Sequence, residues 1–151
     1  MRAVIQRVKH ANVKVAGTTI GEIGHGLLVL LGITHDDGFS DNDWMLKKLL
    51  QLRIFNDADG KMNLSVTDVA GSILVVSQFT LYADAKKGNR PSYIRSAPPA
   101  ISIPLYDNFV ADLQARFTGK VATGEFGAMM DVELLNDGPV TIILDSRQQD
   151  F

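Results

Sequence analysis

The sequence predicts an α+β fold, in which a single domain has a largely antiparallel β-sheet with two main helices packed on it. The chain has 151 residues, of which 46% are hydrophobic and 21% charged, as in an ordinary globular domain. Apolar and polar residues alternate near the amino terminus, whereas helical spacing occurs in two later stretches. No repeat, low-complexity tract or linker divides the chain.

The first third of the chain predicts strands. The segments "AVIQRV" and "NVKVAG" alternate apolar and polar residues, which predicts half-buried strands followed by a turn near Gly17. The run "GLLVLLGI" at 26–33 is apolar throughout, as expected of a central strand that is covered on both faces.

A helix is predicted next. Ser40 and Asp43 indicate its start, because their side-chain oxygens can accept orphan backbone N–H groups. From Trp44 to Leu52 the apolar residues recur at helical spacing. The following "NDADGK" at 56–61 predicts a turn.

The second half predicts another central strand, "SILVVSQF", and then an irregular segment at 85–99 that is rich in Lys, Gly, Asn and Pro. A second helix is predicted to start near Pro104, since proline is tolerated in a first turn, and to end at Gly119. The segments "VATGEF", "MMDVELL" and "PVTIIL" predict the last strands.

Charge is unevenly distributed, although the net charge is only −2. No acidic residue precedes Glu22, and none lies between Asp84 and Asp107. Two readings remain open: a local phosphate-binding surface, or scattered solvated charges. The two acid-free windows hold Arg2, Arg7, Lys9, Lys14, Lys86, Lys87, Arg90 and Arg95.

Several classes of protein are excluded. No apolar run approaches the roughly 20 residues that cross a bilayer, and the amino terminus lacks the apolar core of a signal peptide, so we expect a cytoplasmic protein without a membrane partner. The chain has no cysteine, no HExxH and no nucleotide-binding glycine motif. No metal site or cofactor is predicted, because the acidic cluster His35, Asp36, Asp37, Asp41 and Asp43 lacks calcium-loop spacing.

Ser77, Gln78, Phe79 and Thr80 end an apolar run with two hydroxyls and an amide. In a regular strand Ser77 and Phe79 share one face, and Gln78 and Thr80 share the other. A Ser or Thr nucleophile needs a nearby base, and none is evident in the sequence around this segment. The alternative is a strand end that offers backbone N–H groups to a ligand.

Two further segments carry open alternatives. "LLNDGPVTI" at 134–142 predicts a hairpin, or else a rigid turn with a cis Gly138–Pro139 bond that presents its carbonyls to a ligand. "KKGNRPSYIR" at 86–95 is either a solubilising loop or a contact surface for phosphate and single-stranded nucleic acid. A long irregular loop in a small domain favours function.

These motifs together resemble the D-aminoacyl-tRNA deacylases. The likeness rests on "SQFTL" at 77–81, "GNRPSY" at 88–93 and "NDGPVT" at 136–141, and it extends over nearly the whole chain in order. It implies a deacylase domain at 1–145 with a barrel-like sheet. The residues past the last strand, 146–151, are expected to form a flexible tail, as chain ends commonly do.

The resemblance also implies an activity. The family hydrolyses the ester that joins a D-amino acid, or glycine, to the terminal adenosine of tRNA, without a cofactor and as a homodimer. It implies that Gly138 and Pro139 enter the partner's site and reject L-amino acids, with Arg7 orienting the turn. Residues 77–80 would form the catalytic wall.

The remaining implied site residues lie in two places. Met129 falls in a matching stretch of pocket wall. The acceptor end of the tRNA would dock on the basic loop, through Lys86, Lys87, Asn89, Arg90 and Arg95.

Two mechanisms and two rival functions remain open. Thr80 can act as a nucleophile, or it can position the ester while backbone N–H groups around Phe79 and Thr80 hold the oxyanion and the tRNA 2′-hydroxyl assists water. The lack of a base favours positioning. A Ser/Thr hydrolase of another class and a non-catalytic RNA- or DNA-binding module are the rival functions.

Overall fold

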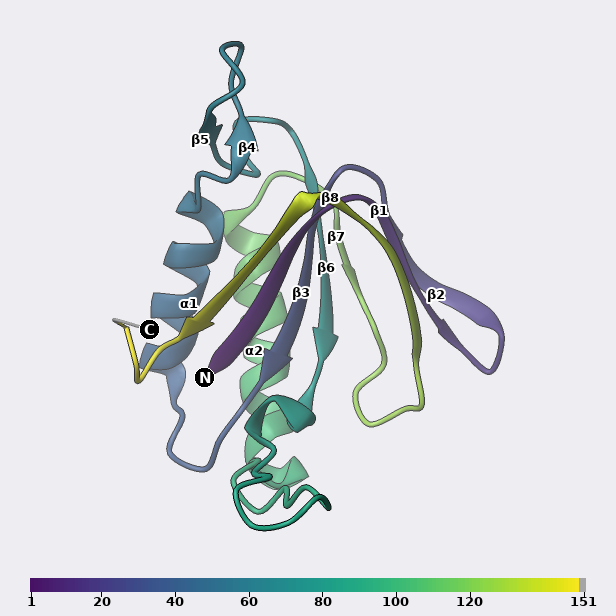
Figure 1. The fold of residues 1–151 in the computed structure, drawn as a ribbon, viewed down its shortest axis with the longest axis vertical. Helices are drawn as coiled ribbons and strands as arrows, with labels where there is room; N and C mark the ends of the chain where they lie inside the picture. Colours follow the sequence, from purple (N-terminus) through teal and green to yellow (C-terminus); the bar gives the residue numbers. More distant parts are fainter. Residues whose placement is uncertain (150–151) are drawn as a thin grey trace.

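The structure, a computed structural model, describes residues 1–149 (Figure 1). Eight strands, two α-helices and one 3₁₀ turn follow one another along the chain. They are β1 (Arg2–Val15), β2 (Thr18–Ile23), β3 (Gly26–Gly32), α1 (Phe39–Gln51), β4 (Phe55–Asn56), β5 (Met62–Leu64), β6 (Ser72–Ser77), η1 (Phe79–Tyr82), α2 (Pro99–Arg116), β7 (Val121–Thr123) and β8 (Asp131–Asp145).

The main sheet is antiparallel in most of its pairings, as predicted, but it is mixed because two of its pairs are parallel. Its order is β2-β1-β3-β6-β7, and β8 pairs with β1. The β1 pairings are antiparallel, but β6 runs parallel to β3 and to β7, because a helix crosses over between the strands of each parallel pair. The sheet nearly closes into a barrel, since a Cβ added at Gly21 in β2 would lie 2.5 Å from the Thr123 carbonyl oxygen in β7.

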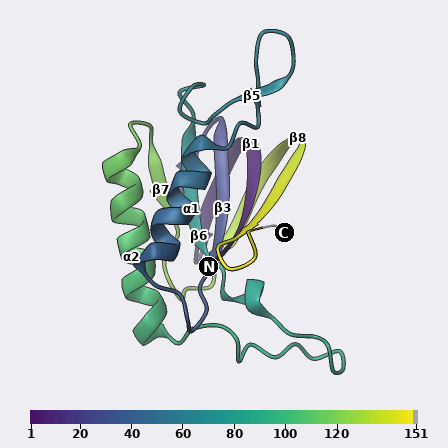
Figure 2. The same cartoon turned by 90° about the vertical axis from the view of Figure 1, so that its left-hand side faces the viewer.

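Both helices pack on the same face of the sheet, as Figure 2 shows. The larger core lies between this face and the helices, where Phe55 and Phe109 are fully buried. A second, smaller core fills the inside of the curved sheet, around Leu28, Leu74 and Val76. Strand β3 contributes to both, which confirms the prediction of a strand covered on both faces.

Helix boundaries differ from those predicted. Helix α1 begins at Phe39 with Gly38 as its N-cap residue, because the Asp41 carboxylate accepts the Gly38 N–H at 2.9 Å. Helix α2 begins at Pro99 and ends at Arg116, so the predicted start near Pro104 is wrong. The Pro98-Pro99 pair starts this helix, since proline has the backbone angle of a first turn already set.

The predicted hairpin at 134–142 is also wrong. Strand β8 continues through this segment and pairs with β1 on both sides of it. Gln6 pairs with Thr141, but Val8 pairs with Asn136, so the intervening β8 residues form a bulge opposite Arg7.

The two ends of the described chain lie side by side, because the Ser146 N–H donates to the Met1 carbonyl at 2.9 Å (Figure 1). The end of the tail predicted at 146–151, residues 150–151, lies outside the described residues. None of the helices in the described part has the length and apolar character needed to span a membrane.

Candidate active site

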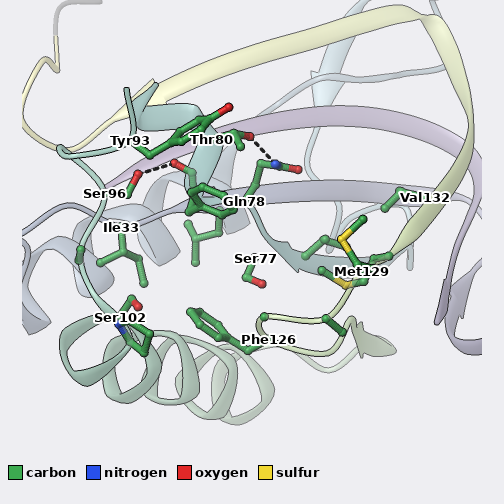
Figure 3. A pocket seen from close by; sticks show the side chains of 18 residues that line it. Ile33, Ser77, Gln78, Thr80, Tyr93, Ser96, Ser102, Phe126, Met129 and Val132 are labelled. Carbon is green, nitrogen blue, oxygen red and sulfur yellow. Dashed lines mark hydrogen bonds between the residues drawn. The ribbon is translucent and has the colours of Figure 1, made fainter. Parts of the chain in front are cut away.

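A cavity of about 670 Å³ opens at the carboxyl end of β6 (Figure 3). Its wall combines the end of that strand, the 3₁₀ turn, the start of α2 and the β7–β8 loop. The lining residues that bear on its chemistry are Ser77, Gln78, Phe79, Thr80, Tyr93, Ser96 and Met129. The structure therefore brings together all four residues of the segment 77–80 that the sequence singles out.

The backbone changes conformation at this wall. Strand β6 ends at Ser77, and the chain enters the 3₁₀ turn at Phe79. A turn of this kind leaves its first N–H groups without an internal partner. Among residues 1–149, the backbone N–H groups of Phe79 and Thr80 have no hydrogen-bond acceptor. These two donors are available to a ligand in the cavity.

The Thr80 hydroxyl has a partner but no base. Its Oγ1 accepts a hydrogen bond from Gln78 Nε2 at 2.5 Å (Figure 3), although the regular strand on which the prediction of a shared face depended ends at Ser77. No His, Lys, Arg, Asp or Glu side chain of the described part of the chain lines the cavity. The geometry thus gives Thr80 no group of its own chain that would accept its proton.

Ser96 fixes the wall and was missed by the sequence analysis. Its hydroxyl donates to the Phe79 carbonyl at 2.8 Å (Figure 3). Tyr93 packs edge-to-face on the Phe79 ring, with the ring centroids 5.1 Å apart. No local signal in the sequence marks Ser96, because its hydrogen bond joins two segments that are 17 residues apart.

Helix α2 supports β6 from behind the cavity. The Tyr106 hydroxyl donates to the Val75 carbonyl at 3.1 Å. Burial, and after it the charge of Asp107, raises the pKa of Tyr106 to about 12. The hydroxyl therefore stays protonated, and able to donate, throughout the physiological range.

Met129 lies on the rim of the same cavity and is 92% exposed. It belongs to the loop between β7 and β8 rather than to a strand. Phe79 and Tyr93, which line the same cavity, are also exposed, and a group of exposed apolar side chains beside a cavity is typical of a surface that a partner or ligand covers.

Arg7 and the Gly138–Pro139 bond lie elsewhere, at the bulge of β8. The bond is cis, and Gly138 has φ +126°. Arg7 is buried and donates to the carbonyls of Ile54 (2.6 Å) and Asp137 (3.1 Å), with the Asp137 carboxylate 3.3 Å from its Nε. Neither Gly138 nor Pro139 lines the cavity of its own chain.

The glycine is required at this bulge. A Cβ at Gly138 would lie 2.8 Å from Val140 Cγ2 and 2.9 Å from Arg7 Nη2. Its φ also falls in the range that favours glycine. The conformation of the bulge is thus set by this chain's own residues.

The predicted tRNA-binding residues form an exposed edge. Lys86, Lys87, Asn89 and Arg90 lie in the exposed loop between η1 and α2 and line neither described cavity. Arg95 lines a second cavity, on the far side of the active-site wall.

The acidic residues near α1 serve the fold. Asp43 pairs with Lys47 and Arg116, each at 2.7 Å. The Asp37 carboxylate is buried against the Met1 amino group at 2.5 Å.

Comparison with known proteins gives a consistent result. The family model described as D-Tyr-tRNA(Tyr) deacylase matches residues 4–145. A protein of Bacteroides thetaiotaomicron named D-aminoacyl-tRNA deacylase is 53% identical over 150 residues, which are 99% of this chain and 100% of that protein. One of the same name from Chloroflexus aurantiacus is 58% identical over 98% of this chain and 92% of its own length.

Two solved structures resemble the fold. The c-Myc DNA Unwinding Element Binding Protein superposes with a TM-score of 0.91 at 42% identity, over 96% of this chain and 98% of that one. A protein described as a probable eukaryotic D-amino acid tRNA deacylase has a TM-score of 0.78 over 95% and 97% of the two chains, and at 17% identity it shows likeness of fold alone.

Proposed function

The chain belongs to the D-Tyr-tRNA(Tyr) deacylase family, and from that premise we propose how its residues carry out and restrict the reaction. It is a D-aminoacyl-tRNA deacylase, a hydrolase of the ester bond between amino acid and tRNA. The proposal assigns the ester to the cavity at the end of β6. The observation that carries it is the pair of unpartnered N–H groups at Phe79 and Thr80, in a cavity without a charged side chain.

The reaction needs an attacking water and a place for negative charge. Water adds to the ester carbonyl, the carbonyl oxygen becomes an oxyanion, and collapse expels the ribose oxygen with its proton. The N–H groups of Phe79 and Thr80 hold that oxyanion, as preorganised backbone donors do in other acyl-transfer sites. The tRNA 2′-hydroxyl assists the water, since this chain places no base in the cavity.

Chirality is selected by excluded volume in this proposal. The chain forms a homodimer, and Gly138 and Pro139 of one subunit enter the cavity of the other with their carbonyls toward the amino acid. Arg7 holds that turn in place, through the contacts to Ile54 and Asp137. An L-amino acid directs its side chain at this rigid backbone, a D-amino acid directs only hydrogen there, and glycine has no side chain to clash.

The tRNA approaches along the basic loop in this proposal. Lys86, Lys87, Arg90 and Arg95 make no ion pair within residues 1–149, so their charges remain available to phosphates. Asn89 lies among them. Because charged tRNA is the substrate, we place the protein in the cytoplasm, where translation uses it.

The test is deacylation of matched D-Tyr-tRNA, L-Tyr-tRNA and Gly-tRNA by the purified protein and by Thr80→Val. We expect the D and glycyl esters to be cleaved and the L ester to be spared. The variant should retain activity within about tenfold, because it loses a side-chain contact and keeps the backbone donors. Ser77→Ala, which lacks the other hydroxyl of the wall, is the matched control.

Each alternative has its own outcome. Loss of turnover by more than about a thousandfold in Thr80→Val would make Thr80 the nucleophile. Equal cleavage of D and L esters would remove the Gly138–Pro139 filter. Salt-sensitive binding without cleavage of any ester would favour a nucleic-acid-binding role, the property named for the 42%-identical c-Myc DNA Unwinding Element Binding Protein.

A further inference from the structure

A second cavity, of about 470 Å³, lies behind the wall of the active site. The two cavities share no lining residue, but the same three segments of chain, around residues 33–35, 80–82 and 93–96, lie between them. Neighbouring residues of each segment face opposite ways. Ile33, Thr80, Tyr93 and Ser96 face the first cavity, and Thr34, His35, Tyr82, Ile94 and Arg95 face the second.

Side chains tie this shared wall together. The Thr34 hydroxyl donates to the Arg95 carbonyl at 2.6 Å, and His35 Nε2 lies 2.8 Å from the Ile94 carbonyl. Because a carbonyl only accepts, the proton of the His35 ring resides on Nε2. The second cavity is therefore held at a fixed position relative to the ester-binding cavity.

The charges around the second cavity suit a single negative charge. Three guanidinium groups and two carboxylates line it, which gives a net charge of +1 with His35 neutral; the charged residues are Arg2, Arg95, Arg147, Asp36 and Asp145. Arg2 pairs with Asp145 at 2.9 Å, and Arg147 pairs with Asp37 at 3.2 Å. The Arg95 side chain makes no ion pair or hydrogen bond within residues 1–149.

A buried hydroxyl adds a second observation. Tyr82 lines the cavity and is 3% exposed, yet its hydroxyl has no hydrogen-bond partner among the described residues. The Arg2 guanidinium lies over its ring, 5.0 Å from the centroid. Burial raises the pKa of Tyr82 above its usual value, so the group keeps its proton and remains a donor. A buried polar atom without a partner is costly, and a bound acceptor would remove that cost.

We propose that this second cavity binds one phosphodiester group of the acceptor strand of the tRNA, with Arg95 as its main contact. The inference rests on the proposed function, because it takes the terminal adenosine to lie in the first cavity. The strand then crosses the shared wall, beside the loop that carries the unpaired lysines and arginines. A phosphodiester carries a single negative charge, which suits the one lining arginine, Arg95, that makes no ion pair within residues 1–149.

The test compares two substrates that differ in phosphate alone. D-tyrosyl-tRNA contains the phosphodiester, whereas D-tyrosyl-adenosine offers the same ester without any phosphate. Arg95→Ala should lower kcat/KM for the tRNA about tenfold, mainly through KM, and leave the adenosine ester within about twofold. The slope of log affinity against log salt should also flatten by roughly 0.7 to 0.9, as for one lost phosphate contact.

Lys120→Ala is the matched control, since it removes one exposed positive charge from the loop between α2 and β7. An equal loss in Lys120→Ala would overturn the proposal, because it would show a general effect of net charge. Equal loss on both substrates in Arg95→Ala would also overturn it, by showing that Arg95 acts through the shape of the catalytic cavity.

Tyr82→Phe gives an independent readout. Removing a hydroxyl without a partner should leave the melting temperature unchanged or higher, yet raise KM for D-tyrosyl-tRNA. A lower melting temperature with unchanged KM would contradict the proposal. Uncharged tRNA should compete with the substrate, whereas inorganic phosphate at the same phosphate concentration should not; equal competition would assign the cavity to a free anion.

Failure of the proposed function is distinguishable from failure of this site. If the wild-type protein cleaved neither ester, the function would fall. Binding of uncharged tRNA to wild type and Arg95→Ala would still test the site, because affinity is measured without turnover. Unchanged tRNA affinity in the variant would then overturn the phosphodiester assignment.

Discussion

Two interruptions of regular strands, at opposite ends of the molecule, hold the residues that the proposed function requires. Strand β6 breaks at Ser77 into a 3₁₀ turn, and β8 bulges at Gly138. The first faces a cavity of its own chain and leaves two N–H groups unpartnered. The second lines neither of the two described cavities, and Arg7 holds it by several contacts.

The two interruptions differ in the role that the proposed function gives to each. In the proposed function the wall at 77–82 receives the ester. Ser96 bonds the Phe79 carbonyl within this wall, and Tyr106 bonds the Val75 carbonyl of the strand that leads to it. The bulge exposes its backbone, and the buried Arg7 side chain secures it. The proposed rejection of the wrong enantiomer requires a surface that resists displacement, and a buried guanidinium with several acceptors gives that resistance.

Of the substitutions considered, Arg7→Ala should have the largest effect, and the effect should fall on the bulge of β8 rather than on the wall at 77–82. It leaves the Ile54 and Asp137 carbonyls without their donor and opens a void beside Gly138. We expect a loss of about 2–4 kcal/mol in the free energy of unfolding and a fall of the melting temperature on the order of 10 °C. Calorimetry measures the stability, and D against L ester cleavage measures the selection.

The location of that damage tests the separation of the two regions. Hydrogen exchange should speed up at the Val140 amide, which donates to Asn136 within the bulge, and stay slow in β6. Arg53→Ala is the control, since this arginine is exposed and bonds Asn63 on the β4–β5 hairpin. A uniform loss of protection from hydrogen exchange in the bulge and in β6 would show that the two regions unfold as one cooperative unit.

The first region was more predictable from sequence than the second. The apolar run of β6 ending in polar residues placed 77–80 at a strand end, where sites gather. The mixed pairing of the sheet was not predictable, because alternation reveals which face is buried but not the direction of the neighbouring strand. Ser96 was missed for a similar reason, since its hydrogen bond joins residues from two segments that only the fold brings together.

The local signal of the bulge is ambiguous and allowed two readings, of which the hairpin is wrong and the cis Gly138–Pro139 bond is present. Asn-Asp-Gly-Pro between apolar residues is the signature of a hairpin. The chain continues straight because β1 runs alongside both halves of β8 and Arg7 fills the space opposite the extra residues. The sequence of residues 134–142 does not reveal this long-range pairing. The resemblance to known deacylases, in contrast, did identify these residues as part of the expected site.

Alkaline pH should weaken the two regions unequally. The pKa of Tyr106 is about 12 in the fold, raised by burial, against about 10 in the unfolded chain. Its contribution is therefore fully present below pH 10 and is lost as pH rises from 10 to 12, by about 2–3 kcal/mol in all. Tyr106 bonds β6 and, within residues 1–149, makes no hydrogen bond to the bulge, so the bulge should persist while the support of β6 fails.

Tyr106→Phe checks this assignment. The variant should be less stable by about 1 kcal/mol at neutral pH, because the bond to the Val75 carbonyl is gone. It should lose less stability than wild type between pH 10 and 12 in denaturant titrations. Parallel curves for the two proteins over that range would mean that Tyr106 contributes nothing to the alkaline loss.

Ser96→Ala should have the smallest effect, and it acts on orientation. The Phe79 carbonyl and the Thr80 N–H belong to one planar peptide group, so the Ser96 hydroxyl that holds the oxygen also aims the N–H. Losing this bond should lower kcat about 3- to 10-fold and leave KM nearly unchanged. The reason is that the Thr80 N–H contacts the oxyanion of the transition state rather than the ester of the bound substrate. Ser96→Thr should recover most of kcat, because it restores the hydroxyl.

Ser102→Ala, which removes a cavity hydroxyl bonded to the Pro98 carbonyl, should leave kcat near that of wild type. Equal losses in Ser96→Ala and Ser102→Ala would mean that the cavity's polarity, rather than the direction of one peptide group, governs the rate.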